Sequence, residues 1–341
     1  MAARIIARSP QPAVSGNWQA ELRAAYREPR ELLADLGLAH AGIALDATTT
    51  FPFRVTRAYA ARMRHGDPHD ALLRQVLPLA DETTAYPAYG DDPVGEFAQL
   101  GTDSLLRKYA GRALLVVTGA CAIHCRYCFR RAFPYQASLG RARLERAIAR
   151  IAADPDICEV ILSGGDPLVL EDDALAALLA RLAALPHIRR VRVHTRLPVV
   201  LPSRITPALL ASLTGQPFTS VLVVHVNHPQ ELDPATVAAL AQARAAGLTA
   251  LNQAVLLAGV NDDVEVLANL SERLFEAGVL PYYLHLLDRV TGTRHFAVPA
   301  ARARELEHAL RARLPGYLVP RVVREIDGAT AKVPLAELPL D

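Results

Sequence analysis

The segment Cys121-Ala122-Ile123-His124-Cys125-Arg126-Tyr127-Cys128 spaces three cysteines as C-x3-C-x2-C, directly after the apolar run Ala113 to Val117. Three thiolates bound to a four-iron cluster leave one iron without a protein ligand, and that iron can chelate the amino and carboxylate groups of a cosubstrate. A structural zinc site or a ferredoxin-like cluster normally has a fourth protein ligand, which His124 inside the loop could supply. The spacing favours a [4Fe-4S] cluster on Cys121, Cys125 and Cys128 over a zinc site.

Outward from this motif, β-rich runs alternate with amphipathic helical runs, which is typical of a parallel βα architecture. We expect strands at Ala113 to Val117, Cys158 to Leu162, Arg190 to His194, Ser220 to His225, Thr249 to Val255 and Pro281 to Leu286. The helices between and after them are expected at Arg141 to Ala153, Asp173 to Leu185, Pro207 to Leu213, Pro234 to Ala246, Asp263 to Ala277 and Ala300 to Leu314. Six such units are too few for a closed eight-stranded barrel. The pattern predicts an α/β fold, a partial open (β/α)6 barrel with functional loops after the carboxyl ends of the strands.

The rest of the chain is expected to form two additions to this barrel, which itself spans residues 107–315. Residues 1–106 contain helical patches such as Trp18 to Tyr26 and Ala58 to Val76, interrupted by prolines, and are interpreted as a helical N-terminal extension. Residues 316–341 are interpreted as a short irregular C-terminal segment.

Composition excludes several classes of function. The chain of 341 residues has 37 basic and 35 acidic side chains, a net charge of +2, so it shows no electrostatic footprint for nucleic acid or an anionic membrane. No apolar run approaches the roughly 18 residues of a membrane span, and Met1 to Ala20 lacks the apolar core of a secretory signal. Three of the four cysteines lie within eight residues, which favours a metal or redox site in a reducing compartment, the cytoplasm. The fourth, Cys158, is expected to be a buried small hydrophobe.

A glycine pair follows the second expected strand, in Ser163-Gly164-Gly165-Asp166-Pro167-Leu168. Glycines allow the backbone to approach a ligand closely. After a cluster loop, this segment resembles the GGE-type segment of radical S-adenosylmethionine (SAM) proteins, which holds SAM. The resemblance implies that Gly164, Gly165 and Asp166 contact SAM, which such enzymes cleave reductively to a 5'-deoxyadenosyl radical.

A wider resemblance extends from about Leu105 to Pro334. The segments that carry it are Cys121 to Arg131 (CAIHCRYCFRR), Ser163 to Leu168, Pro198 to Pro207 (PVVLPSRITP), His225 to Pro229 (HVNHP), Asn252 to Asp262 (NQAVLLAGVND) and Gly316 to Pro320 (GYLVP). Together they strongly resemble the lysine 2,3-aminomutase family, most of all its short bacterial branch that acts with elongation factor P.

The resemblance implies an isomerase that converts L-lysine to (R)-β-lysine, which a lysyl-ligase then uses to modify elongation factor P. A free-lysine 2,3-aminomutase of lysine catabolism shares the chemistry and is the alternative. A noncatalytic iron-sulfur or zinc-binding protein is the alternative from another class. Members of the family tend to self-associate, so a homo-oligomer is expected.

The family uses pyridoxal phosphate (PLP) together with SAM, because a shift of an amino group between neighbouring carbons needs the nitrogen joined to a π system. The resemblance places the lysine that attaches PLP at Lys332, one of only two lysines in the chain. It implies phosphate contacts from Lys108 and Arg112, with Tyr109 beside them.

Three further residues match positions near the cofactors. Asn252 and Gln253 do so, and for them packing or capping is an equal alternative. His285 stands where the family often has a tyrosine near PLP.

A lysine substrate presents a carboxylate at one end and an ammonium at the other. The resemblance implies that Arg130 grips the α-carboxylate, a pairing suited to its planar fork. It implies that Asp288 holds the ε-ammonium. Glu325 falls where a second aspartate is expected, and a solvated surface acid is its alternative. Two acids at this end argue against glutamate 2,3-aminomutase relatives, whose substrate carries an anionic side chain.

Overall fold

The computed structural model describes residues 17–46, 48 and 51–339. The sequence analysis expects no secretory signal in Met1 to Ala20. The first 16 residues of this stretch lie outside the described residues. Among the helices that the structure describes, none combines the length and the apolar character that a membrane span requires.

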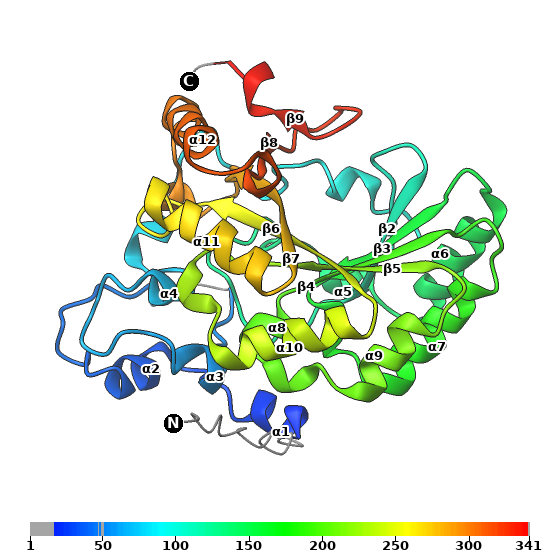
Figure 1. Ribbon diagram of the computed structural model, residues 1–341, viewed down its shortest axis with the longest axis horizontal. Helices are drawn as coiled ribbons and strands as arrows, with labels where there is room; N and C mark the ends of the chain where they lie inside the picture. Colours follow the sequence, from blue (N-terminus) through cyan, green and yellow to red (C-terminus); the bar gives the residue numbers. More distant parts are fainter. Residues whose placement is uncertain (1–16, 47, 49–50, 340–341) are drawn as a thin grey trace, which may run out of the picture.

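Six parallel strands form the centre of one sheet, in the order in which they occur in the chain. They are β2 (Arg112–Thr118), β3 (Glu159–Gly164), β4 (Arg190–Thr195), β5 (Thr219–Val224), β6 (Thr249–Leu256) and β7 (Val279–Leu286). These strands confirm the expected six. Since the strand order runs linearly from β1 to β9, the sheet is open, as expected for a partial barrel (Figure 1).

The helices between the strands lie along the outer side of the curved sheet (Figure 1). They include α6 (Arg141–Ala153), α7 (Asp172–Ala183), α9 (Pro207–Thr214), α10 (Pro234–Ala245), α11 (Val264–Glu276) and α12 (Ala300–Arg313). Two of them begin for a clear local reason. The side chains of Thr206 and Asp233 accept hydrogen bonds from the first turns of α9 and α10, and a proline with preset φ follows each.

The C-terminal segment differs from its expected irregular form. It contains β8 (Arg321–Arg324), which pairs in parallel with β7, and β9 (Val333–Pro334), which pairs antiparallel with β8. Val322 and Val323 are both buried in β8, between two arginines. A run this short shows no alternating pattern in the sequence, and its strand conformation depends on the pairing with β7.

The N-terminal extension is less helical than expected. Its helices are short: α1 (Trp18–Arg23), α2 (Pro29–Asp35), α3 (Arg57–Ala60) and α4 (Ala71–Arg74). The expected helical patch Ala58 to Val76 is broken because Gly66, at φ 75°, and Pro68 interrupt it. The described part of the extension shares its core with the barrel, since Trp18 and Tyr59 belong to the same buried cluster as the barrel strands.

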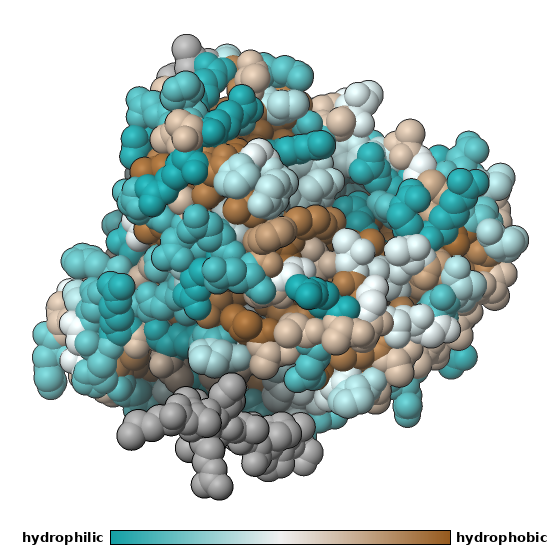
Figure 2. Space-filling model, viewed as in Figure 1, coloured by the Kyte–Doolittle hydropathy of each residue, from teal (hydrophilic) through white to brown (hydrophobic). Residues whose placement is uncertain are grey.

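Two segments of the extension reach the strands directly. Strand β1 (Leu105–Leu106) pairs antiparallel with β2 and forms one edge of the sheet. Upstream of β1, Gly90 bridges to the loop after β7, where its N–H donates to the carbonyl of Arg289 at 3.1 Å. The segment around residue 90 therefore covers this loop. Figure 2 shows polar side chains over most of the visible face, with apolar ones between them near the middle.

Candidate active site at the ends of the barrel strands

Most of the predicted site residues lie at the carboxyl ends of neighbouring parallel strands, where functional loops of such barrels occur. The cysteine loop follows β2, the glycine pair follows at the end of β3, Asp288 follows β7 and Glu325 follows β8. Lys108, Tyr109 and Arg112 differ, because they lie at the start of β2. Asn252, Gln253 and His285 lie within β6 and β7.

The cysteine loop presents three free thiols that are all partly accessible. Burial raises the pKa of Cys121 well above its ordinary value and raises the pKa of Cys128 to about 11. Thiols in such surroundings become thiolates when iron binds and compensates the cost of burying charge. Three thiols on one loop thus fit a cluster with one open iron. Among the residues that the structure describes, no three His, Cys, Asp or Glu side chains converge to hold a single metal ion.

His124, the possible fourth ligand of a zinc site, packs its ring against Phe51 with centroids 5.5 Å apart. Burial lowers the pKa of His124 to about 4. The fourth cysteine is at the other end of the sheet, just before β3, where the Sγ of Cys158 lies 3.3 Å from the carbonyl of Gly111. It is half-buried rather than fully buried as expected, because it precedes the strand instead of opening it.

Arg196, directly after β4, is a residue that the sequence analysis missed. Its Nη1 donates to the Sγ of Cys125 at 2.7 Å. Its Nη2 donates to Gln75 Oε1 at 2.7 Å and to Glu231 Oε2 at 2.9 Å. A fixed cation therefore lies beside the middle cysteine. Its position at the end of a predicted strand was the available signal.

The glycine pair is required by the close approach of the cysteine loop. Gly164 has a φ of 125°, and a Cβ there would lie 2.4 Å from the carbonyl oxygen of Thr118. A Cβ at Gly165 would lie 2.2 Å from the carbonyl oxygen of Ala120. The two loops are thus in backbone contact, and a ligand of the cluster's open iron would also meet the glycine segment. This arrangement fits SAM.

Asp166 connects the end of β3 to the end of β4 through hydrogen bonds. Its carboxylate accepts hydrogen bonds from the Thr195 hydroxyl and the Arg196 N–H, both at 2.7 Å. It also caps the turn that follows, because Leu168 N–H donates to it at 3.0 Å. In this structure the carboxylate holds Arg196 in place, while the expected contact of Asp166 with SAM stays a prediction.

The two lysines of the chain share one carboxylate. Lys108 Nζ donates to Glu325 Oε1 at 2.9 Å, and Lys332 Nζ donates to Glu325 Oε2. Burial alone would raise the pKa of Glu325, but the two lysine charges outweigh it and lower the pKa to about 2. Lys108 precedes β2 and Glu325 follows β8, so their ion pair spans the opening between the two sides of the sheet.

A cavity of about 180 Å³ lies at this opening. It is lined by Lys108, Tyr109 and the loop between β8 and β9. The Tyr109 hydroxyl is buried without a hydrogen-bond partner, and burial together with the nearby Glu325 charge raises its pKa. Arg112 lies over the Tyr109 ring at 5.3 Å. The cavity lining itself contains two cations, Lys108 and Arg107, and one acid, Asp327. An anionic group such as the phosphate of PLP would therefore meet more positive than negative charge there.

Asp288 is a carboxylate without a partner. Its side chain makes no hydrogen bond or ion pair among the described residues, although it is only partly accessible. Burial, followed by the charge of Glu325, raises the pKa of Asp288 to about 7, against the opposing effect of Lys332 and Lys108. A cation that enters the site would therefore find an acceptor here.

Arg130 is fully buried beside the glycine pair, and its fork already holds a carboxylate. Nε and Nη2 donate to the two oxygens of Glu96, each at 2.7 Å. Nη1 donates to Ser163 Oγ at 2.9 Å. The sequence analysis did not identify Glu96, which comes from the irregular part of the extension, far from any motif.

The last three predicted residues have different surroundings. The Asn252 amide bonds both the N–H and the carbonyl of Val226, at 2.9 and 3.0 Å, which is a packing role. Gln253 is buried and makes no side-chain hydrogen bond among the described residues. Burial lowers the pKa of His285 well below its ordinary value. Tyr283, two residues earlier on the same face of β7, is the aromatic ring near Lys332, with Nζ 5.9 Å from its centroid.

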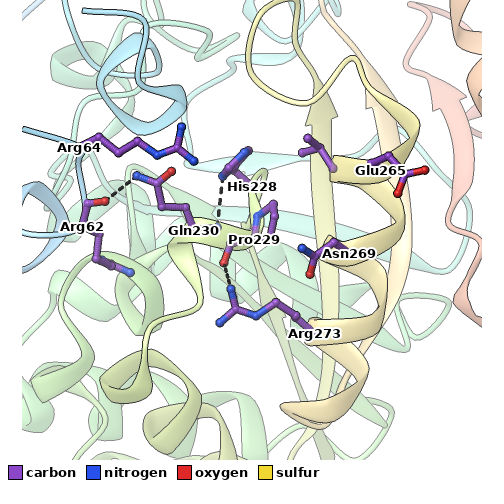
Figure 3. Close-up of a pocket in the computed structure, with 9 residues that line it drawn as sticks. Arg62, Arg64, His228, Pro229, Gln230, Glu265, Asn269 and Arg273 are labelled. Carbon is purple, nitrogen blue, oxygen red and sulfur yellow. Dashed lines mark hydrogen bonds between the residues drawn. The ribbon is translucent and has the colours of Figure 1, made fainter. Parts of the chain in front are cut away.

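A larger cavity, of about 500 Å³, lies elsewhere, between the extension, the loop after β5 and α11 (Figure 3). Arg64, His228 and Arg273 surround it, and Arg273 donates to the carbonyl of Pro229 at 2.7 Å. None of the predicted site residues lines this cavity. It is therefore separate from the candidate active site.

Comparison with known proteins gives one family model, two relatives and one solved structure. The model of the Radical SAM superfamily matches residues 115–270. L-lysine 2,3-aminomutase of Escherichia coli is 45% identical over 323 residues, which is 94% of each chain. The enzyme of the same name from Haemophilus influenzae is 40% identical over 337 residues, 98% of this chain and 100% of that one. Streptococcus suis SuiB, a solved structure, superposes with a TM-score of 0.47 at 17% identity, over 64% of this chain and 50% of that one.

Proposed function

Since the chain belongs to the L-lysine 2,3-aminomutase family of radical SAM proteins, we propose that it is an isomerase that moves the amino group of L-lysine from carbon 2 to carbon 3, giving (R)-β-lysine. When bound, the [4Fe-4S] cluster and SAM supply a radical that removes hydrogen from an unactivated carbon, and PLP supplies a π system for the migrating nitrogen. The protein's own residues hold, orient and enclose these groups.

Different groups of residues are proposed to hold the cluster, SAM and PLP. Cys121, Cys125 and Cys128 hold the cluster, and the adjoining glycine pair brings the SAM-binding loop against them. Lys332 attaches PLP from the hairpin between β8 and β9, which lies beside the cavity proposed for the phosphate. Glu325 keeps both lysines at this opening until the cofactor arrives.

One observation carries the choice of lysine as substrate: Asp288 makes no ion pair, whereas Glu325 and Glu96 are already paired with lysine or arginine. An incoming ammonium would pair with it, whereas an anionic side chain would be repelled. Arg130, which is already paired with Glu96, keeps one Nη2 N–H to donate to the carboxylate at the opposite end of the substrate.

An anaerobic assay tests the proposal. Purified protein with reconstituted cluster, SAM, PLP and a chemical reductant should convert L-lysine to (R)-β-lysine, identified by chiral derivatisation and mass spectrometry. L-glutamate is the matched control substrate. Cleavage of SAM without any β-lysine, or preferential turnover of glutamate, would overturn the proposal.

Removal of the Asp288 charge should specifically abolish lysine binding. In an Asp288→Asn variant the substrate ammonium would be buried without a counter-charge, which costs about 3–5 kcal/mol and raises the KM for lysine by roughly 10²- to 10⁴-fold. Cluster content, PLP loading and lysine-independent SAM cleavage should remain, because they depend on other residues. A wild-type KM in this variant would mean that the lysine pocket has been placed on the wrong residues.

The affinity for lysine should depend on pH through Asp288. Its pKa of about 7 means that the carboxyl group is largely neutral below this pH and cannot pair with an ammonium. Lysine binding should therefore release a proton, and the KM should fall as pH rises from 6 to 8, by at most about tenfold per unit below the pKa. The same titration in Asp288→Asn should be flat. A wild-type KM that does not change across this range would contradict the assignment.

We further propose that the β-lysine serves the modification of elongation factor P by its lysyl-ligase, in the cytoplasm. The resemblance to the short branch supports this, and the length fits that branch, since the alignments span 94% and 100% of the Escherichia coli and Haemophilus influenzae relatives. Intact-mass measurement of elongation factor P from cells with and without the gene tests it. If the modified form persists without the gene, free-lysine metabolism becomes the better assignment.

A further inference from the structure

Arg130 has most of its donors engaged before any substrate is present. A guanidinium has five N–H groups. Nε and one N–H of Nη2 bind Glu96, and Nη1 donates to Ser163 Oγ at 2.9 Å and more weakly to the Gly164 carbonyl at 3.4 Å. One N–H of Nη2 is left without an acceptor among the described residues. A substrate carboxylate therefore meets a guanidinium whose orientation is already set.

Glu96 is itself held firmly. It is 4% exposed, and the two oxygens of Asp92 accept hydrogen bonds from the N–H groups of Glu96 and Phe97, at 2.8 and 2.7 Å. These bonds fix the short turn that carries Glu96. The Glu96 carboxylate is thus buried on a fixed turn, and its contact with Arg130 is not that of a mobile surface side chain.

The contacts of Glu96 extend to both ends of the site. Its carboxylate lies 4.0 Å from Lys108 Nζ, and Lys108 also donates to the carbonyl of Val94 in the same turn. On the other side, Arg130 bonds the glycine segment at the end of β3. A continuous chain of charges therefore connects Lys332, Glu325, Lys108, Glu96 and Arg130.

From this arrangement we propose that Glu96 is a positioning residue for the substrate carboxylate, an inference that rests on the proposed lysine 2,3-aminomutase function. Glu96 holds Arg130 by two hydrogen bonds, so that the free Nη2 N–H has one fixed direction and donates a hydrogen bond to one oxygen of the substrate carboxylate. Without the acid, the guanidinium would keep its charge but lose its fixed direction. Specificity for the free carboxylate of lysine thus depends on a residue of the N-terminal extension.

The test compares L-lysine with its methyl ester, which lacks the carboxylate charge. In Glu96→Gln, the preference for lysine over the ester, measured as the ratio of the two KM values, should fall by about tenfold to a hundredfold, the usual range for loss of a supporting partner. Iron content and lysine-independent SAM cleavage should persist. Dissociation constants of both ligands for the unreduced, cofactor-loaded protein give a second readout that does not require turnover.

Two further variants control the comparison. Glu96→Asp keeps the charge and should recover much of the preference, and it keeps the test available if Glu96→Gln folds poorly. Asp103→Asn removes another buried acid of the extension, which pairs with Arg150 on the outside of the barrel, and should leave the preference unchanged.

The outcomes separate this inference from the proposed function. If the wild-type protein makes no β-lysine, the proposed lysine 2,3-aminomutase function is itself wrong. An active wild type whose Glu96→Gln variant loses lysine and ester affinity equally shows that Glu96 only supports the fold. A variant that binds lysine more tightly shows that Glu96 competes with the substrate. Either of these last two results overturns the positioning role.

Discussion

Replacing Lys332 with alanine should reduce β-lysine formation to background. Lys332 is the only lysine in the hairpin beside the proposed phosphate cavity, and without it PLP has no covalent attachment there. Borohydride reduction of the PLP-loaded wild-type protein, followed by peptide mapping, should leave the pyridoxyl mass on the Lys332 peptide. With two lysines in the chain, the mapping is unambiguous apart from the terminal amine.

Lys108→Arg provides the matched control. It keeps a positive charge near Glu325 and the cavity but cannot attach PLP, so the pyridoxyl mass should remain on Lys332. Because Glu325 binds both lysines in the structure, either amine could in principle be presented to the cofactor. A pyridoxyl mass found only on Lys108 would reverse the assignment.

Replacing Cys125 with alanine should abolish SAM cleavage altogether. A four-iron cluster that loses one of three thiolates is not held by the remaining two, and without its open iron SAM is neither chelated nor reduced. Iron content and the visible absorption of anaerobically reconstituted protein measure the loss. Cys121→Ala and Cys128→Ala should behave alike.

The fourth cysteine is the control for general damage. Cys158 lies before β3, at the opposite end of that strand from the glycine pair, and Cys158→Ala should keep both cluster and activity. Full SAM cleavage by Cys125→Ala would remove the basis of the radical assignment.

The fold was predictable where strand-like and helix-like runs alternate along the sequence. The six central strands are six to eight residues long, largely apolar and separated by helices, so each is recognisable from local pattern alone. Strands β1, β8 and β9 escaped prediction, because they are two to four residues long and depend on pairing with neighbours. The break in the expected patch Ala58 to Val76 has a local signal in Gly66 and Pro68, whereas the packing of the short helices against the barrel core has none.

The candidate site was predictable only where residues form motifs. The cysteine loop, the glycine pair and Asp288 follow strands, so their convergence at the strand ends could be inferred. The partners of Glu96 and Arg196 could not be predicted, because Arg130 and Cys125 are 34 and 71 residues away from them in the chain. The same holds for Glu325, whose expected partner was a substrate ammonium and whose observed partners are the two lysines.

The short edge strands bear on how the protein avoids aggregation. An open sheet has two borders at which another chain could add a strand, and natural proteins keep such borders short or interrupt them with proline. Here β1 and β9 are two residues each, and β9 ends in Pro334, which has no N–H to offer a neighbour. The hairpin proposed to attach PLP thus also limits the pairing of another chain with the β9 edge of the sheet. Mutations that unravel it would expose β8 to intermolecular pairing, so selection for solubility and selection for activity act on the same few residues.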